Sequence, residues 1–246
     1  MLNHKIDIKA LLYAMRRITQ KQSVIKGVLI SLECFIKKTL SYILWSAWQF
    51  RINPFMFIRG IEYTTGRYYI RKFLKNYTDQ CAGYFLEFGD PYFRDCFTSE
   101  KITGYDIMDI VSRPDITILA DIQNCPEIAN NTYDVIVCTQ VLEHIANPFK
   151  AVIELHRILK PGGKLLLSVP AAFPYHAVPN DYWRYTRDSV HLLLDPLFSK
   201  VILHNYGNQL IVTAAYWYWM VDHLPHQSLD IVNPDCPTII CAYAVK

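Results

Sequence analysis

The amino-acid sequence predicts an α/β fold built on a doubly wound, mostly parallel β-sheet, preceded by an N-terminal helical extension. Residues 133–138 (YDVIVC) form a short apolar run rich in β-branched side chains, typical of a strand buried on both faces. Apolar residues then recur every three or four positions over residues 148–159, as in an amphipathic helix, until residues 160–163 (KPGG) end it. Residues 164–169 are a second apolar run. Two strands joined by a helix predict a right-handed parallel βαβ unit.

The composition indicates a folded protein from a reducing compartment. The chain has 246 residues, of which 52% are hydrophobic and 19% charged, enough for one α/β domain with an appendage or for two small domains. Its seven cysteines contain no CxxC pair, so we expect them to be reduced core residues of a cytoplasmic protein. They are Cys34, Cys81, Cys96, Cys125, Cys138, Cys236 and Cys241.

The first third of the chain differs in charge from the rest. Residues 1–80 contain 14 lysines and arginines but 4 acids, whereas the overall formal charge is only +3. Helical spacing of apolar residues predicts helices over 6–18 and 29–47. No uncharged apolar run reaches the roughly 18 residues that span a bilayer. We therefore expect a basic helical extension over residues 1–80, which packs on the domain at 81–246 or rests on an anionic membrane or a lipid-linked substrate.

A second basic segment precedes the first predicted strand. Residues 59–75 (RGIEYTTGRYYIRKFLK) are crowded with tyrosines and basic side chains. A solvated helix explains this composition, and a helix covering a ligand cleft is the alternative. We expect no nucleic-acid partner, because no RNA-binding motif accompanies the basic residues.

The strand–helix–strand unit carries a family resemblance. An aspartate-led strand, QVLEH at residues 140–144, a helix ending in LKPGG and the strand LLLSVP follow one another in this order. The segment resembles the second half of a class I S-adenosylmethionine-dependent methyltransferase of the type 11-like group. The resemblance implies a Rossmann-like sheet of seven strands over residues 81–246, an antiparallel last strand at 238–245, and S-adenosylmethionine as cofactor.

The first predicted strand, at residues 84–89 (YFLEFG), is the first candidate cofactor segment. The resembling family has an acid and a glycine-rich turn at this place, where glycine lets the backbone approach the ligand. Glu87 and Gly89 match the start of that pattern and are expected to bind the cofactor, whereas residues 90–96 (DPYFRDC) replace the later glycines.

A carboxylate is expected at the ribose of the cofactor. Residues 102–107 predict the second strand, which ends near Asp106. An acid at this distance after a first strand accepts the ribose hydroxyls in dinucleotide folds, so Asp106 is the candidate. Asp109 is the near alternative, and either acid could instead cap the next turn.

The adenine side of the cofactor follows the third predicted strand, at residues 115–120. In the resembling family an acid here contacts the adenine amino group and the next residue packs on the ring, which implies Asp121 and Ile122. The resemblance also places Gln140 and Glu143 of the QVLEH segment at the cofactor pocket.

The loop after Pro170 is the candidate acceptor site. Residues 171–186 (AAFPYHAVPNDYWRYT) bring aromatic, acidic and cationic side chains to the carboxyl end of a strand, where stacking and charged hydrogen bonds could recognise a substrate. A rigid lid over the core is the alternative. The candidate substrate-binding residues are Tyr175, Asp181, Tyr182, Trp183 and Arg184.

Methyl transfer to oxygen or nitrogen can also require a base. His176, in this loop, and His144, in QVLEH, are the candidate catalytic residues. The eight histidines lack HxxxH or HxH spacing, so we expect no metal site.

These observations predict an S-adenosylmethionine-dependent transferase that methylates a small-molecule or glycan- or lipid-linked acceptor. We expect it in the cytoplasm, peripherally attached to the membrane through its basic N-terminal helices. The alternative is a catalytically inactive binding or scaffold protein with the same fold, which the replaced glycines favour.

Overall fold

A computed structural model describes residues 31–32, 34–39, 64–177, 179–217 and 221–246. The chain divides into two compact units, Met1–Phe57 and Ile58–Lys246. In the first unit, residues 31–32 and 34–39 are helical and exposed, and the rest of the two predicted N-terminal helices lies outside the described residues. No helix in the described part has the length and apolar character needed to cross a membrane.

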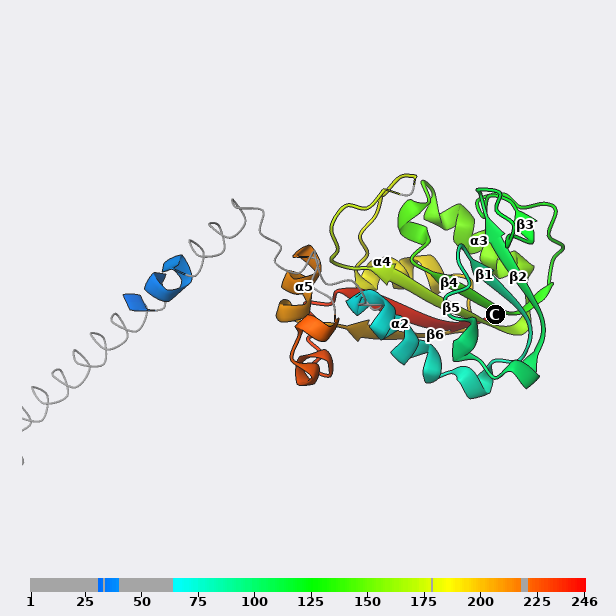
Figure 1. Ribbon diagram of the computed structural model, residues 1–246. Helices are drawn as coiled ribbons and strands as arrows, with labels where there is room; N and C mark the ends of the chain where they lie inside the picture. Colours follow the sequence, from blue (N-terminus) through cyan, green and yellow to red (C-terminus); the bar gives the residue numbers. More distant parts are fainter. Residues whose placement is uncertain (1–30, 33, 40–63, 178, 218–220) are drawn as a thin grey trace, which may run out of the picture. The chain divides into compact units, whose positions relative to one another are not determined.

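Seven strands of the second unit form one sheet among the described residues (Figure 1), in the order β3-β2-β1-β4-β5-β7-β6. Strands β1 to β5 run parallel, and β7 is antiparallel to both β5 and β6. The predicted mostly parallel seven-stranded sheet with an antiparallel last strand is confirmed. The strands are β1 (Gly83–Phe88), β2 (Ile102–Asp109), β3 (Ile118–Leu119), β4 (Tyr133–Thr139), β5 (Leu159–Pro170), β6 (Lys200–Tyr206) and β7 (Ile239–Val245).

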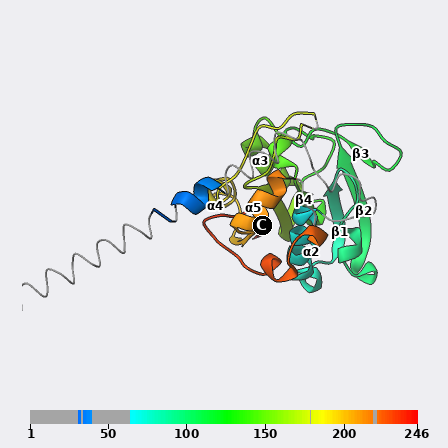
Figure 2. The same cartoon turned by 60° about the vertical axis from the view of Figure 1, so that its left-hand side comes forward.

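Helices cover both faces of this sheet (Figures 1 and 2), as the doubly wound prediction requires. The side chains of β4 alternate between two buried clusters, one on each face of the sheet. On one face, Ile136 packs with helices α3 (Pro148–Ile158) and α4 (Arg187–Leu194). Val135 and Val137 pack on the other face with α2 (Thr65–Lys75) and α5 (Gln209–Tyr216). The β-strands are therefore apolar on both sides because each side faces a helical layer.

Helix α2 corrects the expectation of a solvated basic helix. Tyr69 and Phe73 are fully buried, and Tyr69 stacks on Tyr206 of β6 with ring centroids 5.2 Å apart. The basic side chains occupy the other face, as the helical period allows. Helix α2 therefore belongs to the core of the unit that begins at Ile58.

Strand β1 marks the point where the chain changes direction across the sheet. Its neighbours are β2 on one side and β4 on the other. Crossovers that leave in opposite directions open a crevice at the carboxyl ends of the two central strands, which is where ligands bind in such sheets. The candidate site therefore lies beyond the ends of β1 and β4.

Candidate functional site

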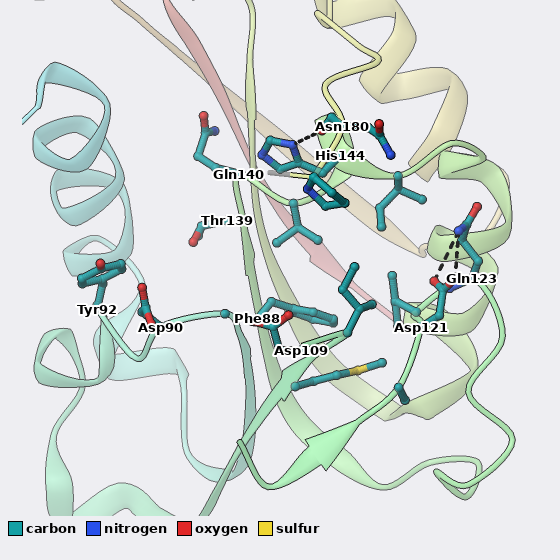
Figure 3. Close-up of a pocket in the computed structure, with 18 of the residues that line it drawn as sticks. Phe88, Asp90, Tyr92, Asp109, Asp121, Gln123, Thr139, Gln140, His144 and Asn180 are labelled. Carbon is teal, nitrogen blue, oxygen red and sulfur yellow. Dashed lines mark hydrogen bonds between the residues drawn. The ribbon is translucent and has the colours of Figure 1, made fainter. Parts of the chain in front are cut away.

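A cavity of about 520 Å³ opens at the carboxyl ends of β1, β2 and β4 (Figure 3). Its size suits a nucleotide-sized ligand. Three loops that follow these strands supply most of the lining, and α2 contributes Arg67 and Ile70. Sequence reasoning missed Arg67, because nothing in the pattern of α2 shows which of its cations faces the sheet edge.

The turn after β1 is shaped by Gly89, whose φ of +72° is a conformation that favours glycine. Gly89 lines the cavity with Asp90 and Tyr92, and its amide donates to the carbonyl of Met108 at 2.9 Å. The Arg67 guanidinium lies 4.0 Å from the centroid of the Tyr92 ring. The turn thus presents backbone, an aromatic ring and a cation to the same part of the cavity.

Glu87 supports this turn from beneath and does not line the cavity, contrary to its predicted place in the cofactor site. Its side chain is fully buried and accepts hydrogen bonds from the Tyr105 hydroxyl and from the Phe93 amide, the latter at 3.2 Å. Burial raises the pKa of Glu87 to about 7. Because Phe93 is held by this bond, Glu87 positions the cavity wall without facing a ligand.

Asp106, the candidate for the ribose, does not line the cavity, whereas its alternative Asp109 does. Asp106 lies inside β2 and accepts hydrogen bonds from the hydroxyls of Tyr84 and Tyr133, away from the cavity. Strand β2 continues to Asp109, three residues later, so Asp109 projects from the opposite side of the strand and lines the cavity. Its Oδ1 accepts from the Val111 amide at 3.0 Å, and its Oδ2 lies 3.4 Å from the Arg113 guanidinium.

The predicted adenine residues lie together after β3. Asp121 and Ile122 both line the cavity, with Ile122 almost completely buried. Asp121 is exposed and accepts from the Gln123 backbone amide at 2.8 Å, a bond that fixes the turn. Its two oxygens also accept from Gln123 Nε2, at 3.3 Å and 3.1 Å (Figure 3). An apolar side chain and a carboxylate are therefore adjacent on this wall.

The segment after β4 combines a residue at positive φ with a buried carboxyl group. Gln140 lines the cavity with a φ of +54°, which is uncommon for a residue with a Cβ. Glu143 lies behind the lining and is fully buried, and neither carboxylate oxygen has a hydrogen-bond partner among the described residues. Burial raises the pKa of Glu143 to about 8. His144, next in the chain, lines the cavity.

His144 is held in one orientation by the loop that follows β5. Its Nδ1 lies 2.6 Å from the carbonyl oxygen of Asn180 (Figure 3), so Nδ1 donates a hydrogen bond to this oxygen and Nε2 is left on the other side of the ring. His176 comes from the same loop, with its ring centroid 5.0 Å from that of His144. Burial lowers the pKa of His176, so its ring is neutral at pH 7.

Among the predicted acceptor residues, only Tyr182 lines the cavity. Asp181 and Arg184 bind one another through two contacts, 2.6 Å and 2.7 Å long, so they brace the loop. The Arg184 guanidinium holds the pKa of Asp181 well below its usual range. Tyr175 is 72% exposed and Trp183 is 42% exposed, so neither closes over the cavity.

Several hydrogen bonds tie the candidate acceptor loop, residues 171–186, to the segment after β4. The Tyr182 amide donates to the carbonyl of Glu143 at 2.7 Å, and Trp183 Nε1 donates to the carbonyl of Ile145 at 2.8 Å. Both carbonyls follow a strand end and have no partner in the sheet. The two walls of the cavity are therefore directly linked.

Comparison with known proteins agrees with this architecture. A methyltransferase domain family matches residues 82–211. A thiol S-methyltransferase from Rattus norvegicus is 35% identical over 82 residues, which are 30% of this chain and 34% of that protein. A ubiquinone biosynthesis O-methyltransferase from Xanthomonas oryzae is 40% identical over 55 residues, 21% of this chain and 23% of that protein. The chain thus spans about a third or less of these curated relatives.

A solved structure supports the fold. The phosphoethanolamine N-methyltransferase 2 of Haemonchus contortus, in complex with phosphomonomethylethanolamine and S-adenosylhomocysteine, superposes with a TM-score of 0.51 at 14% identity. The superposition covers 73% of this chain and 52% of that chain. At this identity the likeness concerns the fold alone.

Proposed function

This chain belongs to the methyltransferase domain family, and from that premise we propose that it transfers a methyl group from S-adenosylmethionine to a small-molecule or glycan- or lipid-linked acceptor. The observation that carries the proposal is the cavity at the β1/β4 switch point, where Gly89, Asp109 and Asp121 project from three successive strand ends. This is the place where a doubly wound sheet binds its nucleotide.

The lining residues fit S-adenosylmethionine from one end of the cofactor to the other. The carboxylate of Asp109 suits the two ribose hydroxyls, Ile122 suits a face of the adenine, and Asp121 suits its amino group. At the other end, the cation of Arg67 lies near the Gly89 turn and suits the carboxylate of the methionine part. When bound, the cofactor supplies an electrophilic methyl group on a sulfonium.

The protein contributes mainly by holding the acceptor in line with that methyl group. A hydroxyl, amine or thiol acceptor also loses a proton, and His144 is the base candidate that lines the cavity. Its Nδ1 contact with the Asn180 carbonyl keeps Nε2 free for this task. His176 is the other candidate base, and its ring centroid lies 5.0 Å from that of His144.

We propose a hydrophobic acceptor at a cytoplasmic membrane surface. Tyr182 lines the cavity and is half exposed, so its aromatic ring suits an apolar or ring-containing molecule. The relatives named for thiol and ubiquinone-pathway methylation favour the same class of acceptor. The 14 basic residues among the first 80 supply the charge for an anionic surface.

Calorimetric titration of the full chain with S-adenosylhomocysteine tests the cofactor site. We expect Asp109→Ala to weaken binding about 30- to 100-fold, because it removes two hydrogen bonds to a charged acceptor. Asp106→Asn is the matched control, an acid on the same strand but outside the cavity, and should change the affinity less than about threefold. No binding by folded wild-type protein at millimolar ligand would favour the inactive scaffold, and equal losses in both variants would contradict the placement of the ribose.

A further inference from the structure

The side chains of Glu143, His144 and His176 converge behind the cavity wall. The Nε2 atoms of the two histidines lie 3.9 Å and 3.8 Å from Oε1 of Glu143, and one ligand atom from each residue falls within 4.8 Å of the others. We propose that these three residues bind one divalent transition-metal ion. The inference goes beyond methyl transfer, because the ion would bind whether or not the cofactor does.

The separations suit a metal ion better than direct hydrogen bonds. At 3.8 Å and 3.9 Å the imidazole nitrogens are too far from the carboxylate to donate to it. A point equidistant from the three atoms lies about 2.5 Å from each, and small inward rotations give the roughly 2.0–2.2 Å bonds that Zn²⁺ makes to nitrogen and oxygen. The gap between the three side chains is thus close to the size of a coordinated cation.

The carboxylate of Glu143 is the independent observation that points to a ligand. It is fully buried, and both of its oxygens lack a hydrogen-bond partner in the described part of the chain. A buried carboxylate without partners is costly in a folded protein, and coordination of a cation is one of the few ways to satisfy it.

Contacts on the far side of each imidazole aim both Nε2 atoms at Glu143. His144 Nδ1 lies 2.6 Å from the Asn180 carbonyl oxygen. His176 Nδ1 lies 3.3 Å from the Pro174 carbonyl oxygen and 3.3 Å from Oδ2 of Asp181. Carbonyl and carboxylate acceptors behind a histidine are the usual support for a metal ligand, because they fix the ring and the protonated nitrogen.

Two imidazoles and one carboxylate favour a borderline ion such as Zn²⁺, Fe²⁺ or Co²⁺ over Mg²⁺ or Ca²⁺. Three protein ligands leave at least one coordination position open. Since His144 lines the cavity, that position is accessible from the ligand side. If the proposed methyl transfer holds, an acceptor hydroxyl or thiol at the open position would lose its proton more easily, and the histidines would hold the ion instead of taking the proton.

Absorption of Co²⁺ tests the site without any enzymatic readout. Full-length protein without an affinity tag is stripped with chelator and titrated with Co²⁺, and bound Co²⁺ is then displaced with Zn²⁺. We expect one equivalent of Co²⁺ to bind with visible absorption bands of low coordination number. Glu143→Gln, His144→Gln and His176→Gln should each weaken binding more than about 100-fold, since even loss of an outer-shell partner costs 10- to 100-fold.

His191→Gln is the matched control. His191 also lies beside a carboxylate, with Nδ1 3.1 Å from Asp195, but this pair is exposed on α4. The control should change Co²⁺ affinity less than about twofold, and circular dichroism melts establish that each variant is folded. Wild-type protein that binds no Co²⁺ at micromolar concentration, or a Glu143→Gln variant that binds as well as wild type, would overturn the inference.

Titration with S-adenosylhomocysteine on the same preparation separates the two proposals. Binding of the cofactor product without Co²⁺ binding overturns the metal site alone. Binding of Co²⁺ without S-adenosylhomocysteine supports the metal site and contradicts the proposed function.

Discussion

Two buried glutamates stand at the ends of adjacent strands and have opposite surroundings. Glu87 of β1 lies two residues before Gly89, and Glu143 follows β4 three residues after Gln140, so each is close to a residue with positive φ. Glu87 accepts from two donors, whereas Glu143 accepts from none in the described structure. A buried carboxylate whose partners are all internal supports a wall, and one without partners is available to a ligand.

The difference originates in the neighbouring elements. Strand β2 pairs with β1 and places Tyr105 opposite Phe85, two residues before Glu87, so the Tyr105 hydroxyl reaches the Glu87 carboxyl group and offsets part of the cost of its burial. Around Glu143 the acceptor loop contributes His176 instead, at a distance too long for a hydrogen bond. Glu87 therefore stabilises the fold, whereas Glu143 is available to bind a ligand.

The largest expected effect is on stability. Urea unfolding in the presence of a chelator compares the unfolding free energies of Glu87→Gln and Glu143→Gln with that of the wild type. A glutamine at 87 has one acceptor oxygen for two donors, so we expect a loss of about 2 kcal/mol of unfolding free energy. Glu143→Gln replaces a buried carboxyl group that has no hydrogen-bond partner in the described structure, so it should not lower the stability. Equal losses in the two variants would contradict the distinction between them.

The pH dependence of stability provides a second test. The pKa of Glu87 is about 7 in the folded protein and near 4.5 when unfolded, so the folded state holds more protons between these values. Stability should therefore fall as pH rises through this window, by at most about 1.4 kcal/mol per pH unit from this group.

Glu87→Gln should reduce that slope between pH 4.5 and 7, measured as the urea midpoint at each pH. The groups facing Glu87 are Tyr105, Asp95 and Arg71, and the pKa of Tyr105 is raised by burial, so it does not titrate in this range. An unchanged slope in the variant would show that Glu87 is ionised throughout.

The smallest expected effect concerns the turn after β1. Gly89→Ala places a Cβ at a φ of +72°, where no atom obstructs it, so the loss comes from the backbone alone and should be about 1 kcal/mol. Gly89→Asn is the control, because asparagine tolerates a positive φ. Gln140, at the end of β4, also adopts a positive φ. We expect Gly89→Asn to lose about half as much unfolding free energy as Gly89→Ala. Identical unfolding curves for both variants and the wild type would contradict a requirement for glycine at position 89.

Local patterns in the sequence predicted the sheet well and the site in part. The period change from β4 to α3 and the KPGG segment, which lies within β5 near its start, located the βαβ unit, because buried strands and amphipathic helices have distinct spacings. The sequence favours Asp106 over Asp109 because it predicts the end of β2 two residues too early. That small error changes which face of the strand a side chain occupies.

The parts of the site that depend on tertiary contacts could not be predicted. Arg67 reaches the cavity only because α2 packs on the sheet. The convergence of His176 with Glu143 joins segments more than 30 residues apart, so no short spacing motif exists. Asp181 and Arg184 looked like free recognition groups, and only the folded loop shows that they bind one another.

The bonds from Tyr182 and Trp183 to the carbonyls of Glu143 and Ile145 have an evolutionary consequence. These bonds to main-chain carbonyls join the loop at residues 171–186, which we propose to face the acceptor, to the segment after β4, which we propose to face the cofactor. A mutation that changes the conformation of the loop should also shift the segment after β4, and the reverse. We therefore expect new acceptor preferences in this protein to arise from coupled changes in both segments. Grafting the loop from a relative without residues 142–145 would transfer its side chains but not their placement.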